Sequence, residues 1–174
     1  MGIQLELTVA ILIAFPILGG LMMFQSAVAS RIPLLHGSVD LILLALVAWA
    51  LQKHVNTAWH WALIGGLLFS LASALPVGVM LLGYLGTIGL AELFKRRVWH
   101  VPILAMFVTV FLGTLITHFL SILALLLSGT PLPFLQTLNL VTLPSLLLNT
   151  LLAVPMYAIM GDLAGWLYPQ EIEV

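Results

Sequence analysis

Long apolar segments constrain this chain more than any other feature of its sequence. Six hydrophobic stretches, separated by short connections, fill nearly all of the 174 residues, of which 63% are hydrophobic and 6% are charged. A transmembrane helix needs about 20 predominantly apolar residues, and lipid cannot satisfy free backbone N–H and C=O groups. We therefore expect an all-α polytopic membrane protein with six transmembrane helices, forming one domain over residues 1–174.

Prolines help to place the boundaries of these helices. Pro33, Pro76 and Pro102 fall at the starts of segments, where a missing N–H costs little. Pro16 and Pro155 lie inside segments and predict kinks. The expected spans are Leu5–Phe24, Leu34–Leu51, Trp59–Leu75, Val77–Phe94, Val101–Leu127 and Leu143–Leu167.

The basic residues predict the orientation of the chain in the membrane. Lys53 lies in the second connection and Lys95–Arg97 in the fourth, whereas Arg31 is the one basic residue on the opposite side. Because short cytoplasmic loops carry an excess of Lys and Arg, we expect these two connections and both termini to be cytoplasmic. The five tryptophans agree, since all fall at helix ends on that side: Trp49, Trp59, Trp61, Trp99 and Trp166.

Composition also argues against several classes of protein. The chain has no cysteine, which excludes disulfides and thiolate metal sites. Its net charge is −1 and no basic run is longer than Lys95–Arg97, so we expect no nucleic-acid partner. Glu6 stands where a signal peptide would carry basic residues, so we expect the first segment to remain as a helix.

Polar residues within the apolar segments predict a polar centre in the outer half of the membrane. Ionisable groups are costly there, so each needs a partner or a function. Asp40 lies in the second expected helix and His36 four residues earlier, which would place both on one helix face. Further polar residues recur at helical spacing in the fifth and sixth helices. The candidate centre comprises His36, Asp40, Thr114, Thr117, His118, Ser121, Thr142, Ser145 and Asn149.

Three interpretations of this centre remain open. The simplest is hydrogen bonding between helices, which holds a membrane bundle together. The second is a substrate or partner site that opens outward. The third is a metal site built from His36, Asp40 and His118, whose ligand types suit zinc although a fourth ligand is missing. No nucleophile has a recognisable neighbouring base, so we expect no enzyme and no catalytic residue. Because the metal site lacks a fourth ligand, we assign no metal and no cofactor.

Small residues form candidate faces for close helix contact. Gly161 and Gly165 form a Gly-x-x-x-Gly arrangement around Asp162, which lets another helix approach closely. Such faces serve either packing within a bundle or contact with a membrane partner. The candidate faces are Gly65 and Gly66, then Gly83, Gly86 and Gly89, and finally Gly161 and Gly165.

Three stretches of sequence resemble a known family. The first is Ile32-Pro33, which leads into the Asp40-containing helix. The second runs from Gly65 to Gly78 and on through Gly83-Tyr84-Leu85 into the basic loop; its Gly-Leu-Leu-Phe-Ser-Leu-Ala-Ser-Ala-Leu-Pro-Val-Gly is similar to the family pattern Gly-Leu-Leu-x-Asp-Leu-x-Ser-Gly-x-Pro-Leu-Gly. The third is Leu147-Leu148-Asn149 with Tyr157 further along. From about Ile32 onward the chain thus resembles MreD, the small membrane subunit of the bacterial rod-shape system, or elongasome.

Two positions depart from the family pattern. Ser70 stands where the family commonly has Asp, and Ala74 where it commonly has Gly. A role that the family assigns to that carboxylate therefore cannot be carried over to Ser70.

The resemblance implies a non-enzymatic scaffold in the bacterial inner (cytoplasmic) membrane. The implied partners are membrane lipid, an MreC-like bitopic protein and, through it, MreB filaments, RodA and a class B penicillin-binding protein. The implied function is support of lateral peptidoglycan synthesis and cell shape. The implied fold is similar to the substrate-binding subunits of energy-coupling-factor vitamin transporters, so a transporter subunit of that type is the alternative function.

Overall fold

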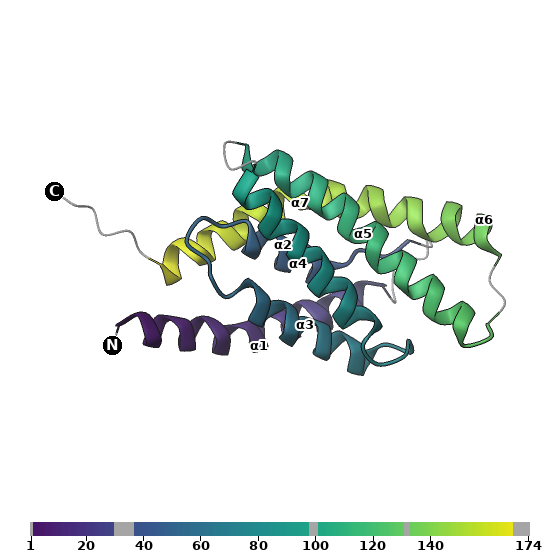
Figure 1. Ribbon diagram of the computed structural model, residues 1–174, viewed down its shortest axis with the longest axis horizontal. Helices are drawn as coiled ribbons and strands as arrows, with labels where there is room; N and C mark the ends of the chain where they lie inside the picture. The colour runs from purple at the N-terminus through teal and green to yellow at the C-terminus, as the bar shows by residue number, and fades with distance from the viewer. Residues whose placement is uncertain (1, 30–36, 98–100, 131–132, 169–174) are drawn as a thin grey trace.

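The computed structural model describes residues 2–29, 37–97, 101–130 and 133–168, and this part of the chain is helical with no β-strand. The all-α class expected from the sequence is therefore confirmed. Figure 1 shows the helices packed lengthwise into one bundle. The elements are α1 (Gly2–Ala29), α2 (Leu41–Ala50), α3 (Ala58–Ala72), α4 (Val79–Arg97), α5 (Pro102–Leu127), α6 (Phe134–Thr137), the π-helical turn η1 (Leu138–Thr142) and α7 (Leu143–Leu167).

Among the described residues, three helical stretches are long and apolar enough to cross a membrane. They are Thr8–Ala27 within α1, Pro102–Leu127, and the continuous run Phe134–Leu167 formed by α6, η1 and α7. Two shorter apolar helices, α2 and α3, accompany them. Length and composition thus indicate a membrane protein, whereas six complete crossings stay a prediction.

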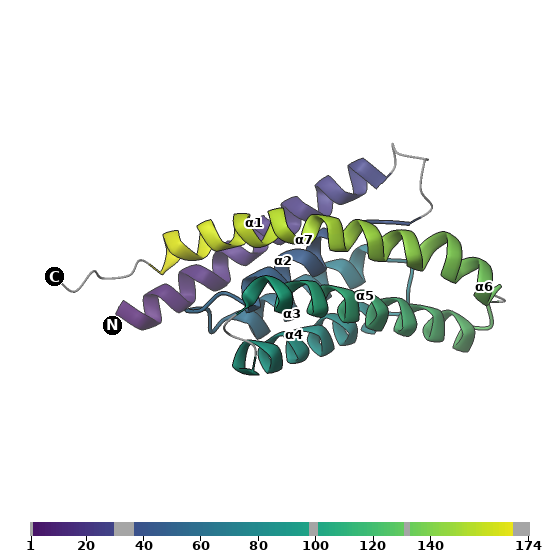
Figure 2. The same ribbon diagram turned by 90° about the horizontal axis from the view of Figure 1, so that it is seen from above.

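The short helix α2 forms the centre of the bundle. Every residue from Ile42 to Ala50 is buried, and α2 packs against α1, α3, α4, α5 and α7. Figure 2 shows the same arrangement from above, with α2 enclosed between α7 and the α3–α4 pair. A helix that is apolar on all sides is expected in such a fully surrounded position.

Two tryptophans fill the core beside the end of α2. The rings of Trp49 and Trp61 stack with their centroids 4.4 Å apart, and both side chains are fully buried. The Trp49 indole N–H donates to Thr57 Oγ1 at 3.1 Å, and that of Trp61 donates to the Ala10 carbonyl at 2.9 Å. Each buried indole therefore has the hydrogen-bond acceptor that it needs.

The helix expected over Leu34–Leu51 is wrong in its first part. Residues 37–40 are not helical, and α2 begins at Leu41, where Asp40 is the N-cap. The chain runs too close to α7 for anything but glycine here, because a Cβ on Gly37 would lie 2.6 Å from Pro144 Cβ and 2.7 Å from the Ser145 nitrogen. The chain therefore passes α7 in an open conformation and starts its helix afterwards.

The last helix begins earlier than expected. The sequence predicts a start at Leu143, whereas the helical run starts at Phe134 and passes through η1 before α7. A proline lacks an N–H and its ring clashes with the carbonyl four residues earlier. The widened π turn directly before Pro144 accommodates that ring and lets the helix continue.

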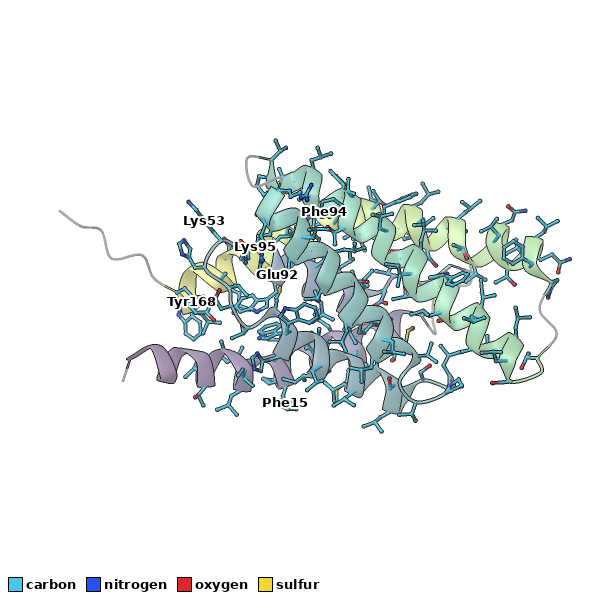
Figure 3. The ribbon with its side chains drawn as sticks, in the orientation of Figure 1. Phe15, Lys53, Glu92, Phe94, Lys95 and Tyr168 are labelled. Atoms are coloured by element: carbon cyan, nitrogen blue, oxygen red, sulfur yellow. The ribbon has the colours of Figure 1, made fainter. Side chains whose placement is uncertain are left out.

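The basic residues expected at the cytoplasmic surface gather at one end of the bundle. Figure 3 shows Lys53, Glu92 and Lys95 toward the end of the bundle at which α7 finishes. Lys95 Nζ donates to the Val55 carbonyl at 2.9 Å and lies 3.9 Å from the Glu92 carboxylate. Lys95 thus joins the end of α4 to the connection between α2 and α3.

Candidate functional site

The candidate site is the hydrogen-bonded network at the start of α2, which we call the α2 network. Its backbone is the non-helical segment 37–40 together with the first turn of α2. Non-helical backbone is tolerated at membrane depth only where other protein groups satisfy it. The polar side chains around the start of α2 are therefore needed, first of all, as hydrogen-bond partners for the backbone of residues 37–40.

Side chains from two other helices meet that requirement. The Ser38 amide donates to Ser145 Oγ at 3.0 Å, and the Asp40 amide donates to Asn149 Oδ1 at 2.9 Å. The Leu41 amide donates to Gln25 Oε1 at 2.8 Å. Thus α7 supplies acceptors to two amides of the open segment, and α1 supplies one to the first residue of α2.

The Asp40 carboxylate has partners of its own. Its Oδ1 accepts the Leu43 amide at 2.9 Å, which is the hydrogen bond of a helix N-cap. The Tyr84 hydroxyl lies 3.0 Å from Oδ1 and 2.9 Å from Oδ2, so one O–H is shared between the two oxygens. Tyr84 is itself fully buried in α4, and its ring meets Phe69 edge-on at 6.1 Å. The carboxylate is thus held by a helix end and a buried phenol.

The network continues from α7 into α5. Asn149 Nδ2 donates to Thr114 Oγ1 at 3.0 Å, and Thr114 Oγ1 donates to the Val110 carbonyl at 2.8 Å. Thr114 lies close to the middle of α5 (Pro102–Leu127), so this part of the network is far from both ends of that helix. A chain of hydrogen bonds therefore connects Asp40 through Asn149 to α5.

Other predicted members of the polar centre lie outside this chain of bonds. His118 Nδ1 pairs with Thr142 Oγ1 at 3.2 Å, which joins α5 to η1. Ser121 Oγ donates to the Thr117 carbonyl at 2.7 Å, within its own helix. Of the candidate residues, Asp40, Thr114, Ser145 and Asn149 belong to the α2 network, whereas His118, Ser121, Thr117 and Thr142 bond elsewhere.

The proposed pairing of His36 with Asp40 loses its premise. His36 lies outside the described residues, and the described segment 37–40 that was expected to be helical is not. In the described part of the chain, no group of three or more His, Cys, Asp or Glu side chains could hold a metal ion.

Sequence reasoning missed three contributors to the network: Tyr84, Gln25 and Ser38. The first two carried a readable signal, because a phenol or an amide inside an apolar helix needs a hydrogen-bond partner. Ser38 acts through its backbone N–H, which a continuous helix would have occupied. Its role could not be read before the break in α2 was known.

The candidate glycine faces divide into closed and open ones. A Cβ on Gly66 would meet Leu81 at 2.7 Å, and one on Gly83 would meet Thr117 Cγ2 at 2.9 Å. Gly65 faces Ile42 of α2 at 3.1 Å. These three glycines therefore serve packing within the bundle.

The remaining glycines leave more room. The nearest neighbours of a Cβ are Ile116 at 4.0 Å for Gly86, Trp59 at 3.5 Å for Gly89 and Gln52 at 3.5 Å for Gly161. Gly165 has nothing within 4 Å among the described atoms. The Gly161/Gly165 face is thus the most open of the three predicted faces.

These features define a class: an α-helical membrane protein built around a short buried central helix, preceded by an open segment whose Ser38 and Asp40 amides donate to side chains of α7. Comparison of the chain with protein-family models, with curated proteins and with solved structures gives no significant match. The function is therefore argued from the residues and their geometry.

Proposed function

We propose that this protein is a non-enzymatic scaffold of the rod-shape complex in the bacterial cytoplasmic membrane. In this role it supports lateral peptidoglycan synthesis and cell shape by associating with an MreC-like bitopic protein, and through it with RodA and a class B penicillin-binding protein. The three stretches that resemble MreD are the source of this proposal.

One structural observation supports a scaffold over a catalyst. The α2 network directs its polar groups to the chain's own backbone: Asn149 caps the Asp40 amide and Asp40 caps α2. An intramembrane carboxylate is a candidate functional group by default, but here a helix end and the Tyr84 hydroxyl occupy it. A polar centre of this kind gives the bundle a fixed shape, which is what a scaffold requires.

The open Gly161/Gly165 face suits association through helices. Small residues let a partner helix approach closely, and in lipid such contacts rest on van der Waals packing and hydrogen bonds. The first test is purification of the tagged chain from its native membranes in mild detergent, with mass spectrometry of the proteins that accompany it. Recovery of an MreC-like protein with RodA or a penicillin-binding protein is the expected result.

A transporter substrate-binding subunit is the second candidate, and one observation favours it. Short or interrupted helices with ends near the middle of the membrane are frequent at transporter binding sites, and the short helix α2 begins inside the bundle. The same purification separates the two functions. Recovery of a transmembrane coupling protein with paired ATPases, in place of cell-wall proteins, would reject the scaffold and make the α2 network a substrate site.

A further inference from the structure

The apolar lengths of neighbouring helices differ by much more than a flat bilayer allows. The helix α3 has 15 residues and measures about 22 Å at about 1.5 Å per residue, less than the roughly 30 Å of a bilayer's hydrocarbon core. The apolar part of α4, from Val79 to Ala91, is about 20 Å long by the same rise. In contrast, α5 has 26 residues and measures about 39 Å.

The long side of the molecule consists of residues that belong in lipid. Between Val101 and Met160 the chain contains no Asp, Glu, Lys or Arg. Phe119 and Leu127 on the last turns of α5 are 66% and 80% exposed, and Phe134 on α6 is 59% exposed. An uncharged helix pair with apolar side chains outward is stable in hydrocarbon and not in water.

Packing contacts show where the two sides differ in height. A Cβ on Gly83 of α4 lies 2.9 Å from Thr117 of α5, so these residues are level with each other. From that level α4 runs back to Val79 over about 6 Å, whereas α5 runs on to Leu127 over about 15 Å at the rise of an α-helix. The end of α5 thus lies beyond the start of α4 by about 9 Å.

The α3–α4 pair, which is the short side of the molecule, cannot shift along the membrane normal to remove this difference in height. The end of α4 carries Lys95, Arg96 and Arg97, which belong at the membrane surface, and Lys95 is bonded to the Val55 carbonyl at that surface. Moving α4 toward the other surface would draw these charges into the hydrocarbon. The mismatch therefore falls on the opposite surface, at the connection between α3 and α4.

That connection has a backbone that needs water. Residues 73–78 are non-helical and join the end of α3 to the start of α4. Leu71 just before this connection and Val77 within it are 79% and 78% exposed. Non-helical backbone exposed to lipid does not occur in the hydrocarbon region, because its polar groups have no partner there. The membrane surface must therefore come down to this connection.

We propose that the protein thins the bilayer locally against its α3–α4 hairpin. The headgroup surface opposite Lys95 descends to residues 73–78, while it keeps its full height along α5 and the α6–η1–α7 run. The partner of this surface is the phospholipid bilayer itself, in a deformed state. The bilayer is then thinner beside the α3–α4 hairpin than beside α5. This proposal does not depend on the scaffold function.

Cysteine-scanning spin labelling tests the proposal, since the chain contains no native cysteine. Val77→Cys and Leu123→Cys form a matched pair: both side chains are exposed, and counting outward from the Gly83–Thr117 level places them at similar heights on opposite sides of the step. Each labelled variant is reconstituted alone in dioleoylphosphatidylcholine vesicles. Collision rates with oxygen and with a water-soluble nickel chelate report the depth of each label.

Thinning predicts that the label at position 77 meets the nickel chelate several-fold more often than the label at position 123, which reads as hydrocarbon. Longer-chain dierucoylphosphatidylcholine should enlarge the difference. Equal depths in the hydrocarbon would mean a flat bilayer and overturn the proposal. Chelate access at both positions would mean that the end of α5 projects into water, which also overturns it.

Discussion

At the scale of single residues, the buried carboxylate of Asp40 has a structural role as the N-cap of α2 and the partner of Tyr84. A carboxylate in the membrane interior normally needs a cation, but this one accepts the Leu43 amide and the Tyr84 hydroxyl instead. Its position at the N-terminus of α2 adds a favourable interaction with the helix dipole. The same residue thereby ends the unwound segment and ties α2 to α4.

We expect Asp40→Ala to lower the free energy of unfolding by about 1–3 kcal/mol, because it leaves the buried Tyr84 hydroxyl and the Leu43 amide without an acceptor. Asp40→Asn keeps an acceptor oxygen and should cost less. Thermal unfolding in detergent, followed by the fluorescence of the buried Trp49–Trp61 pair, measures both.

A double-mutant cycle with Tyr84→Phe isolates the Asp40–Tyr84 hydrogen bond. Membrane hydrogen bonds measured in this way average about 0.6 kcal/mol and reach about 1.7 kcal/mol, so we expect a coupling within that range. Tyr157→Phe is the control, since its hydroxyl makes no hydrogen bond within the described residues. Strict additivity of Asp40→Ala and Tyr84→Phe would contradict the bond.

At the scale of elements, α4 and α5 interlock through a reciprocal pair of contacts. Thr87 of α4 packs against Gly113 of α5, and Thr117 of α5 packs against Gly83 of α4. The threonine hydroxyls bond to carbonyls of their own helices, so their methyl groups are free to fill the glycine positions. Close approach of two helices through small residues is the usual way to pack in lipid.

We expect Gly113→Ala to loosen this interface, because the new Cβ would lie 2.5 Å from Thr87 Cγ2. Overpacking of this kind costs about 1–3 kcal/mol, which should appear as a lower melting temperature in detergent. Gly86→Ala is the matched control: its Cβ has 4.0 Å of clearance, and alanine favours a helix by about 1 kcal/mol. Equal effects of the two changes would show that the close contact does not limit stability.

The open Gly161/Gly165 face of α7 allows a test of partner contact. Gly161→Leu combined with Gly165→Leu should lower the melting temperature only by what displacing the Gln52 amide from the Ala48 and Tyr157 carbonyls costs, since a Cβ on Gly161 meets Gln52 first, at 3.5 Å, and one on Gly165 meets nothing within 4 Å among the described residues. We expect the doubly substituted chain to lose co-purifying membrane proteins. Gly20→Leu is the control, because it adds the same side chain to open space on α1. Unchanged recovery would make the Gly161/Gly165 face incidental.

At the scale of the whole molecule, periodicity predicted the helices and several members of the network but not the open segment before α2. The spacing of polar residues in the fifth and sixth helices correctly brought Thr114, Ser145 and Asn149 into one region. The chain is open at residues 37–40 because Gly37 packs closely against Pro144. These two residues are far apart in sequence, so no local pattern encodes the open segment. An apolar run looks the same whether it is one continuous helix or a short buried helix preceded by open chain.

The arrangement of the ends leads to a prediction about topology. The start of α1 and the end of α7 lie at the same end of the bundle (Figure 1), and Lys53 and Lys95 gather there as well (Figure 3). An even number of crossings places both termini on one side, and the basic residues assign that side to the cytoplasm.

Fusions of green fluorescent protein to either terminus should therefore fluoresce, and alkaline phosphatase fused to the C-terminus should be inactive. Phosphatase inserted after Gly129, in the exposed turn that follows α5, should be active and serves as the control for export. Active phosphatase at the C-terminus with a fluorescent N-terminal fusion would require an odd number of crossings. Because α2 and α3 are the two shorter apolar helices, one of them would then fail to cross the bilayer. If that helix is α3, the local thinning that lets the short α3–α4 hairpin span the bilayer would have to be abandoned too.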